Sequence, residues 1–184
     1  MSLLLAAVAA FGLQTDAVTV QPKFWDGTLS ACEIVFDNYF VDSNYLNGTP
    51  VHVAGSWSLS HFSDSNSLFG VLKVGVMPQD GDAIGPSDAY IISGYTTNKV
   101  DQKFAIDSEA QGFRLFGFDS TGEATMMALM SPSVEGHFKV GYVLGEGRSP
   151  QTFEVVMSDD HTQQYSDCVS ALVRTIEQSI AAHQ

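Results

Sequence analysis

Histidines and carboxylates are the side chains in this sequence that could do acid–base or metal chemistry. The chain has five histidines, namely His52, His61, His137, His161 and His183. None lies in a metal or catalytic pattern such as H-E-x-x-H, and neither a G-x-S-x-G nucleophile motif nor a G-x-x-x-x-G-K-[ST] phosphate loop occurs. His52 falls on the polar face of a predicted strand, so we interpret it as a solvated surface residue. The sequence therefore predicts no catalytic residue, no metal ligand and no cofactor.

Two acidic segments offer oxygen ligands. Asp80, Asp82 and Asp88 lie in the loop PQDGDAIGPSD, and oxygen-rich loops of this kind can hold calcium. The loop lacks the ligand order of an EF-hand, so an ordinary acidic turn is our preferred interpretation and calcium is the alternative. The pair Asp159–Asp160 precedes His161, but adjacent residues of an extended chain point in opposite directions. We interpret this second segment as a polar loop that leads to a final helix.

The only two cysteines are Cys32 and Cys168. An even count in a chain with an export-like N-terminus predicts a disulfide between them. The alternative is two separate buried thiols in a cytosolic protein, because unpaired cysteine is among the most buried residue types. The spacing fits neither a zinc site nor a C-x-x-C redox centre.

Several aromatic residues lie near the first cysteine in the sequence: Phe24, Trp25, Tyr39, Phe40 and Tyr45. Aromatic groups with a polar handle are enriched at binding surfaces, although they are also ordinary residues of a core edge. We predict a possible binding surface that includes Trp25, Tyr39 and Tyr45. Asn47–Gly48–Thr49 matches a glycosylation acceptor, but Asn–Gly is also a strong hairpin turn, which we prefer.

Residues 1–17 read MSLLLAAVAAFGLQTDA and contain an apolar run from Leu3 to Leu13. This pattern predicts a secretory signal peptide that is cleaved before Val18, and hence a periplasmic or secreted protein. The run is too short to span a bilayer, which takes about 20 apolar residues in a helix. No Lys or Arg precedes Leu3, so an upstream start or a buried N-terminal helix remains the alternative.

Charge and composition exclude some kinds of partner. The chain has 184 residues and a formal net charge of −13, with 21 acidic residues against 8 Lys and Arg. The few cations form no cluster, which excludes electrostatic binding of nucleic acid and opposes binding to anionic lipid. Hydrophobic residues make up 45% of the chain, so we expect a globular domain with a substantial core.

Alternation of apolar and polar residues predicts that the chain is mainly β. The alternating segments are residues 51–59, 138–144 and 153–157. Other segments are apolar on both faces and are expected to be central strands: residues 68–77, 89–95 and 125–130. Eight or nine short strands separated by turns predict an antiparallel β-sandwich, with a small β-barrel as the alternative.

The end of the chain has the pattern of one amphipathic helix over residues 166–182. Apolar residues recur every four positions from Cys168 to Ile180, and Ser166 can cap the helix. We expect the helix to cover an open end or a sheet edge. Residues 18–184 are thus predicted to be a single β-rich domain closed by this helix.

The order of features over about residues 104–173 resembles small bacterial periplasmic proteins of the invasion-associated locus B type. The matching features are a strand end at Ile106–Asp107, Phe116 followed by Gly122 and Ala124, the alternating strand Phe138–Leu144 after Gly136, and Phe153–Ser158 before a short helix. Phe118 and Glu123 stand where members of that family typically carry a cysteine pair. The resemblance implies an exported, β-rich envelope protein without enzymatic activity.

We therefore expect an exported binding or accessory protein of a bacterial envelope, without catalytic activity, whose partner is an unknown protein or a small hydrophobic ligand. One alternative is a β-barrel carrier or enzyme for a small hydrophobic ligand, with an interior lined by Met126, Met130, Phe116 and Tyr142. Another is a structural or assembly subunit. The sequence leaves the oligomeric state open.

Overall fold

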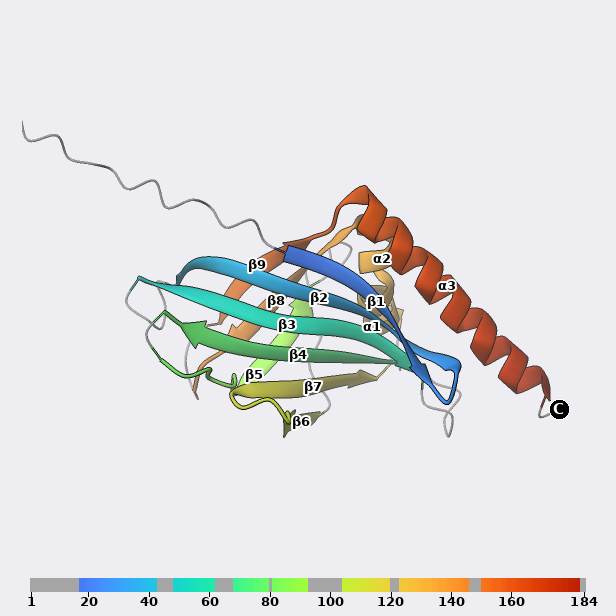
Figure 1. The fold of residues 1–184 in the computed structure, drawn as a ribbon, viewed down its shortest axis with the longest axis horizontal. Helices are drawn as coiled ribbons and strands as arrows, with labels where there is room; N and C mark the ends of the chain where they lie inside the picture. Colours follow the sequence, from blue (N-terminus) through green and yellow to red (C-terminus); the bar gives the residue numbers. More distant parts are fainter. Residues whose placement is uncertain are drawn as a thin grey trace, which may run out of the picture.

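Two antiparallel sheets and a long C-terminal helix make up the computed structural model, which describes residues 17–42, 48–61, 68–79, 81–92, 104–119, 123–145 and 150–182. The larger sheet has six strands in the order β1-β2-β3-β4-β7-β6, and the smaller has three in the order β5-β8-β9 (Figure 1). Within the described residues the sheets do not close on each other, so the sandwich prediction is confirmed and the barrel alternative is wrong. The elements are β1 (Ala17–Trp25), β2 (Thr28–Asp42), β3 (Thr49–His61), β4 (Leu68–Pro78), β5 (Asp88–Ile92), β6 (Phe104–Asp107), β7 (Phe113–Asp119), α1 (Glu123–Met130), α2 (Pro132–Glu135), β8 (His137–Val143), β9 (Gln151–Val156) and α3 (Asp159–Ala182).

The larger sheet has one face toward the smaller sheet, which we call the inner face, and an opposite outer face. On β3 the predicted alternation is confirmed, because Val51, Val53, Trp57 and Leu59 are at most 2% exposed and point inward. The predicted alternation is also confirmed on β8 and β9, whose inward side chains are buried. A strand directs successive side chains to opposite faces, so the core is built from every second residue.

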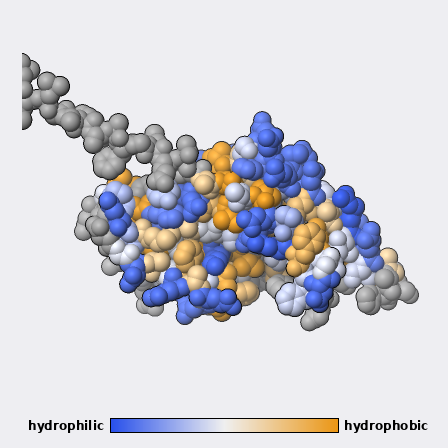
Figure 2. All heavy atoms as spheres, in the orientation of Figure 1, coloured by the Kyte–Doolittle hydropathy of each residue, from blue (hydrophilic) through white to orange (hydrophobic). Residues whose placement is uncertain are grey.

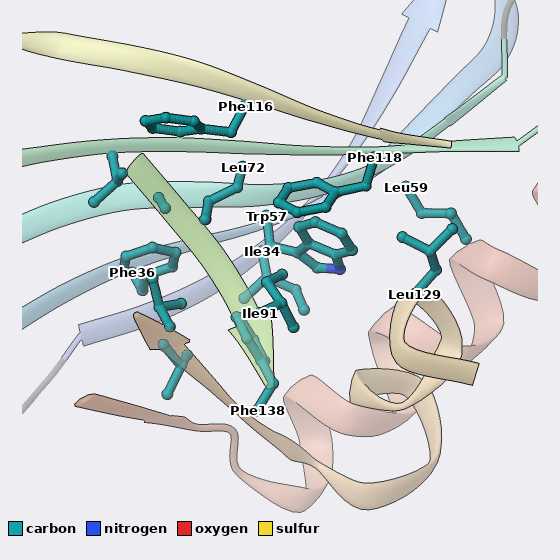
Figure 3. Packing of buried hydrophobic residues seen from close by; sticks show 14 of the residues in the cluster. Ile34, Phe36, Trp57, Leu59, Leu72, Ile91, Phe116, Phe118, Leu129 and Phe138 are labelled. Carbon is teal, nitrogen blue, oxygen red and sulfur yellow. The ribbon is translucent and has the colours of Figure 1, made fainter. Parts of the chain in front are cut away.

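The core lies between the two sheets and extends beneath α3. Figure 3 shows aromatic rings from both sheets meeting there, with Trp57 next to Phe118 and Phe36 facing Phe138. Leu72, at the centre of β4, is fully buried among them. Burying one such side chain contributes about 1.5–3 kcal/mol, so this apolar interior is the main source of stability.

Helix α3 begins seven residues earlier than the sequence pattern indicates. Its first turn is capped by Ser158, whose Oγ accepts a hydrogen bond from the His161 backbone N–H at 3.2 Å. The predicted cap at Ser166 is wrong, and Asp159–Asp160 form the first turn rather than a polar loop. Carboxylates are favourable at this end of a helix, because the helix dipole is positive there.

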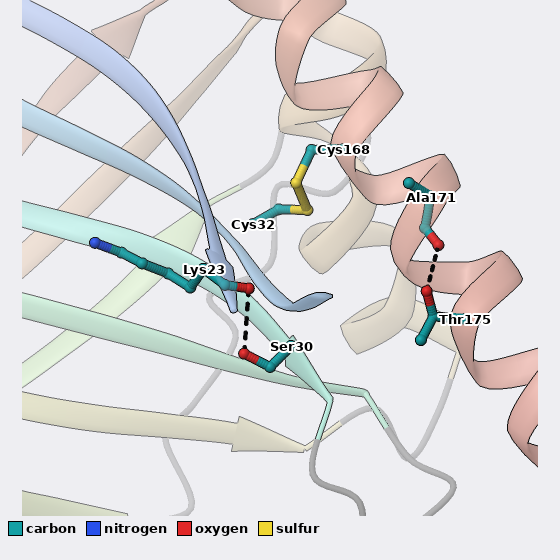
Figure 4. The surroundings of a disulfide bond; sticks show 6 residues. All are labelled: Lys23, Ser30, Cys32, Cys168, Ala171 and Thr175. Atoms are coloured by element: carbon teal, nitrogen blue, oxygen red, sulfur yellow. Dashed lines mark hydrogen bonds between the residues drawn. A yellow bond between two sulfur atoms is a disulfide. The ribbon is translucent and has the colours of Figure 1, made fainter. Parts of the chain in front are cut away.

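The predicted disulfide is confirmed between Cys32 on β2 and Cys168 on α3, with a Cα–Cα distance of 5.9 Å (Figure 4). Helix α3 packs against the inner face of β1, β2 and β3, where the smaller sheet leaves the core open. It therefore covers an open end of the core and also contacts the edge strand β1. Nearby, the Ser30 hydroxyl donates to the Lys23 carbonyl at 3.2 Å, beside an irregularity in the β1–β2 register.

Residues 125–130 form helix α1 and not the predicted central strand. The segment from Glu123 to Met130 is rich in Ala and Met, which are strong helix formers. A short run that is apolar on all sides has no period that distinguishes a buried helix from a buried strand. Leu129 of this helix is 1% exposed and closes one end of the core.

Strand β1 has no counterpart among the predicted strands, because it lies at the sheet edge and alternates only in its first half, where Val18 and Val20 are partly buried against the core. Its turn to β2 is formed by Asp26 and Gly27, both with positive φ (47° and 76°), as in two-residue hairpins. Pro22 in the middle of β1 has no backbone N–H to offer a neighbouring chain, which is typical of an edge strand.

Strand β5 is an edge strand of the smaller sheet, although the sequence pattern predicts a central strand over residues 89–95. Its described part ends at Ile92, and it pairs with β8 alone. It is apolar on both faces because Ala89 and Ile91 enter the core while Tyr90 lies over Gly141 of β8.

Candidate interaction surface

The outer face of the larger sheet carries none of the described helices or strands. The smaller sheet and α3 all pack on the inner face (Figure 1). Antiparallel sheets with one solvated face normally have polar side chains there. Any apolar part of this outer face is therefore a candidate interaction surface.

Strands β4, β7 and β6 present an apolar outer face, which we call the apolar platform. Phe104 and Ile106 on β6 are 47% and 53% exposed, and the other members are partly exposed. Cross-strand register places all of them on this face. The platform consists of Phe69, Val71, Met77, Phe104, Ile106, Phe113 and Leu115. Figure 2 views this face, and orange and tan atoms lie among blue ones over its lower half, where Figure 1 places these strands.

Two aromatic rings of the platform lie over glycines of the neighbouring strand. Phe113 covers Gly75, where a Cβ would come within 2.8 Å of the ring, and Phe104 covers Gly117 so closely that a Cβ there would clash. Each ring therefore packs onto the backbone of the next strand, which makes the platform flat. The Lys73 ammonium lies 5.4 Å from the centre of the Phe113 ring, within the range of a cation–π interaction.

The other half of the outer face, on β1, β2 and β3, is mainly polar, although it includes Val35 and Val41, and its charges are paired. Lys23 Nζ lies 2.8 Å from Glu33 Oε2, and His52 Nε2 lies 2.7 Å from Asp37 Oδ1. The Tyr39 ring stacks on the His52 ring with a centroid distance of 4.3 Å and an interplanar angle of 3°. His52 is therefore held by two neighbours, in contrast to the solvated surface histidine that the sequence pattern predicts.

The predicted aromatic binding residues are not brought together. Trp25 is 74% exposed at the tip of the β1–β2 hairpin, and Tyr39 is 39% exposed near the other end of β2. Trp25 pairs with Thr28, and eleven residues of extended chain from Thr28 to Tyr39 span about 36 Å. Tyr45 lies outside the described residues. Trp25 and Tyr39 thus share the outer face but form separate sites.

Sequence reasoning misses the platform, although its signal is present in β4. Residues 68–77 are apolar on both faces, and we interpret this pattern as a central strand whose two faces are both buried. Strand β4 is indeed central, between β3 and β7. Its outer side chains, among them Val71 and Met77, nevertheless remain partly exposed.

Within the described residues, the groups considered for metal binding do not form a metal site. Asp82 is exposed, Asp88 begins β5, and Asp80 lies outside the described residues. No group of three His, Cys, Asp or Glu side chains in the described ranges is arranged to hold a metal ion. His137 lies 4.0 Å from Glu135 Oε2 at the start of β8, and His161 is in the first turn of α3.

The residues expected to line a ligand-binding interior occupy different parts of the core. Phe116 and Tyr142 are fully buried, and Met126 and Met130 on α1 are partly buried. Strand β8 starts beside α2 at His137, and Tyr142 lies five residues further on, at a distance of about 16 Å. Tyr142 is therefore remote from the helical end of the core.

One pair of polar atoms is buried beneath α3. Trp57 Nε1 and the Tyr165 hydroxyl are both inaccessible to solvent and make no hydrogen bond of normal geometry. Burial raises the pKa of the Tyr165 hydroxyl far above its usual range, and the Trp57 indole N–H opposes this shift in part. The two groups therefore face each other where the helix meets β3.

The disulfide and the helices bear on the cellular compartment in which the protein is located. Disulfides persist in oxidising compartments, so the Cys32–Cys168 bond is typical of an exported protein. In the described part of the chain, no helix has both the length and the apolar character needed to cross a membrane.

The chain matches no protein-family model, no curated protein and no solved structure.

Proposed function

We propose that this protein is an exported binding or accessory protein of a bacterial envelope, located in the periplasm or secreted, which acts through surface contacts and catalyses no reaction. The apolar platform is the observation that carries the proposal. Exposed apolar patches on soluble proteins mark sites of interaction. Here seven apolar side chains gather on a face that carries none of the described helices or strands.

Three observations support export. The disulfide ties β2 to α3 across 136 residues of sequence, and such a bond is rare in a reducing cytosol. The apolar run from Leu3 to Leu13 has the length of a signal-peptide core. The resemblance to the invasion-associated locus B type points to the same compartment.

Export is tested by expressing the full-length chain in bacteria and measuring its intact mass in the periplasmic fraction without reductant. The expected species is Val18–Gln184, lighter by two hydrogens for the disulfide. A full-length Met1–Gln184 chain in the cytoplasm, with both thiols free, would contradict export.

The binding surface is tested with Nile red, a neutral dye that fluoresces on apolar surfaces. Ile106→Ser on the platform should reduce dye binding, whereas Val156→Ser, at a 61% exposed residue of β9, should reduce it less. One saturable dye site per chain that does not respond to Ile106→Ser would favour the carrier alternative and contradict the proposed surface.

A further inference from the structure

One lysine lies within the apolar platform without an anionic partner. Lys73 is on the outer face of β4, between platform residues on either side along the strand. Lys23, at the opposite end of the face, is paired with Glu33 at 2.8 Å, whereas no carboxylate of the described residues forms an ion pair with Lys73. Its ammonium lies 5.4 Å from the centre of the Phe113 ring instead. The platform therefore contains a positive charge that no described anion neutralises.

A buried hydroxyl lies beside this lysine. Ser56 of β3 is the cross-strand partner of Lys73, and both side chains are on the outer face. Ser56 is only 7% exposed, so it lies below the level of its neighbours. Its hydroxyl makes no hydrogen bond with a described residue, although it is not among the polar atoms that are closed to solvent. Directly opposite residues of an antiparallel pair have Cβ atoms about 4.5–5.5 Å apart, and the lysine stem is flexible, so one anionic group can contact both side chains.

We propose that this site binds a long-chain carboxylate such as a fatty acid. The inference rests on the proposed function, because it uses the apolar platform as the binding surface. The Lys73 ammonium and the Ser56 hydroxyl donate to the carboxylate oxygens, in hydrogen bonds that the charge of the carboxylate strengthens. The hydrocarbon tail packs on Val71, the next outer residue of β4, and on Leu115, the partner of Lys73 on β7.

The charge of the protein favours a small ligand with one negative charge. A chain with a net charge of −13 repels an anion in proportion to the charge of that anion. An anionic bilayer or an acidic protein is therefore repelled more strongly than one carboxylate, whose single charge the Lys73 ammonium neutralises. Four carboxylates of the chain belong to α3, on the other side of the sheet, and charges farther apart than the Debye length of about 8 Å are largely screened.

The proposal is tested by equilibrium dialysis of radiolabelled decanoate and 1-decanol, which have the same tail but different head groups. At about pH 8 the carboxyl group is ionised. The oxidised wild type should bind decanoate more tightly than 1-decanol. Lys73→Met removes the charge and keeps an apolar stem, so it should weaken decanoate binding about tenfold and leave 1-decanol binding unchanged. Ser56→Ala should weaken decanoate binding about fivefold.

Lys139→Met is the matched control, because Lys139 is an exposed lysine of β8 in the smaller sheet. It should leave the binding of both ligands unchanged. A wild type that binds no decanoate, or binds it no more tightly than 1-decanol, would overturn the proposal, as would decanoate binding that Lys73→Met leaves unchanged.

These outcomes are distinct from a failure of the proposed function. Nile red binding that responds to Ile106→Ser, without a preference for decanoate, refutes only the carboxylate ligand. A protein that binds neither the dye nor decanoate refutes both the ligand and the surface.

Discussion

Removal of the Cys32–Cys168 bond should lower stability mainly through the unfolded state. The bond joins residues 136 apart, so it closes a long loop in the unfolded chain. By chain entropy, a cross-link that closes a loop of this length contributes about 5 kcal/mol at 25 °C. For a chain of this size that corresponds to a decrease of about 10–20 °C in the melting temperature.

The assay is urea unfolding of the oxidised wild type, the reduced wild type and the Cys32→Ala/Cys168→Ala double variant. The reduced protein keeps both sulfur atoms, so its loss of stability measures the cross-link alone. The double variant also removes the fully buried Cys32 sulfur and should be slightly less stable. Both should unfold with a steeper dependence on urea, because an unfolded chain without the cross-link exposes more surface.

A loss below about 1 kcal/mol on reduction would refute this reasoning, since the chain entropy of even a short disulfide loop exceeds that value. An unchanged urea dependence would also count against it, because the effect would then arise in the folded state. The control is the double variant in reductant, whose stability should not change.

Two further predictions concern buried contacts. Burial raises the pKa of Tyr165, so the unfolded chain ionises first as the pH passes about 10, and the wild type should then lose stability relative to Tyr165→Phe by up to about 1.4 kcal/mol per pH unit. Urea unfolding between pH 8 and 11.5 checks this, and parallel curves for the two proteins would contradict it. Gly55→Ala should cost about 1–3 kcal/mol, because the new Cβ clashes with the Lys73 carbonyl oxygen. Gly81→Ala, whose nearest neighbour is the Pro78 Cβ at 4.0 Å, should stay within about 0.5 kcal/mol in the same assay.

The wrong predictions from the sequence concern segments whose local pattern of apolar and polar residues does not determine the secondary structure or where it begins. Residues 125–130 have apolar side chains in every direction, so helix and strand predict the same burial. The apolar stripe of α3 begins near Ser166 and so predicts a start there, while the polar first turn depends on the cap at Ser158. Strand β1 alternates only from Ala17 to Gln21 and is exposed over the rest of its length, so its pattern is short.

The sequence by itself determined the features that depend on local geometry and on composition. The period of two along β3, β8 and β9 predicts strands and their buried faces, because a strand must direct alternate side chains to opposite sides. A single pair of cysteines leaves one possible intramolecular disulfide, between Cys32 and Cys168. The acidic net charge and the scattered cations predict that the chain does not bind nucleic acid electrostatically.

Only the tertiary structure decided which apolar surface the described helices and strands leave uncovered. Strand β7 lies beside β4, although about 40 residues separate them in the sequence, and β6 lies at the edge. This order places the Phe104 ring on Gly117 and the Phe113 ring on Gly75, and so creates the apolar platform. The pattern of apolar residues along a strand is the same whether their side chains face the core, a second chain or water. Strand order is set by long-range pairing, and local periodicity contains no information about it.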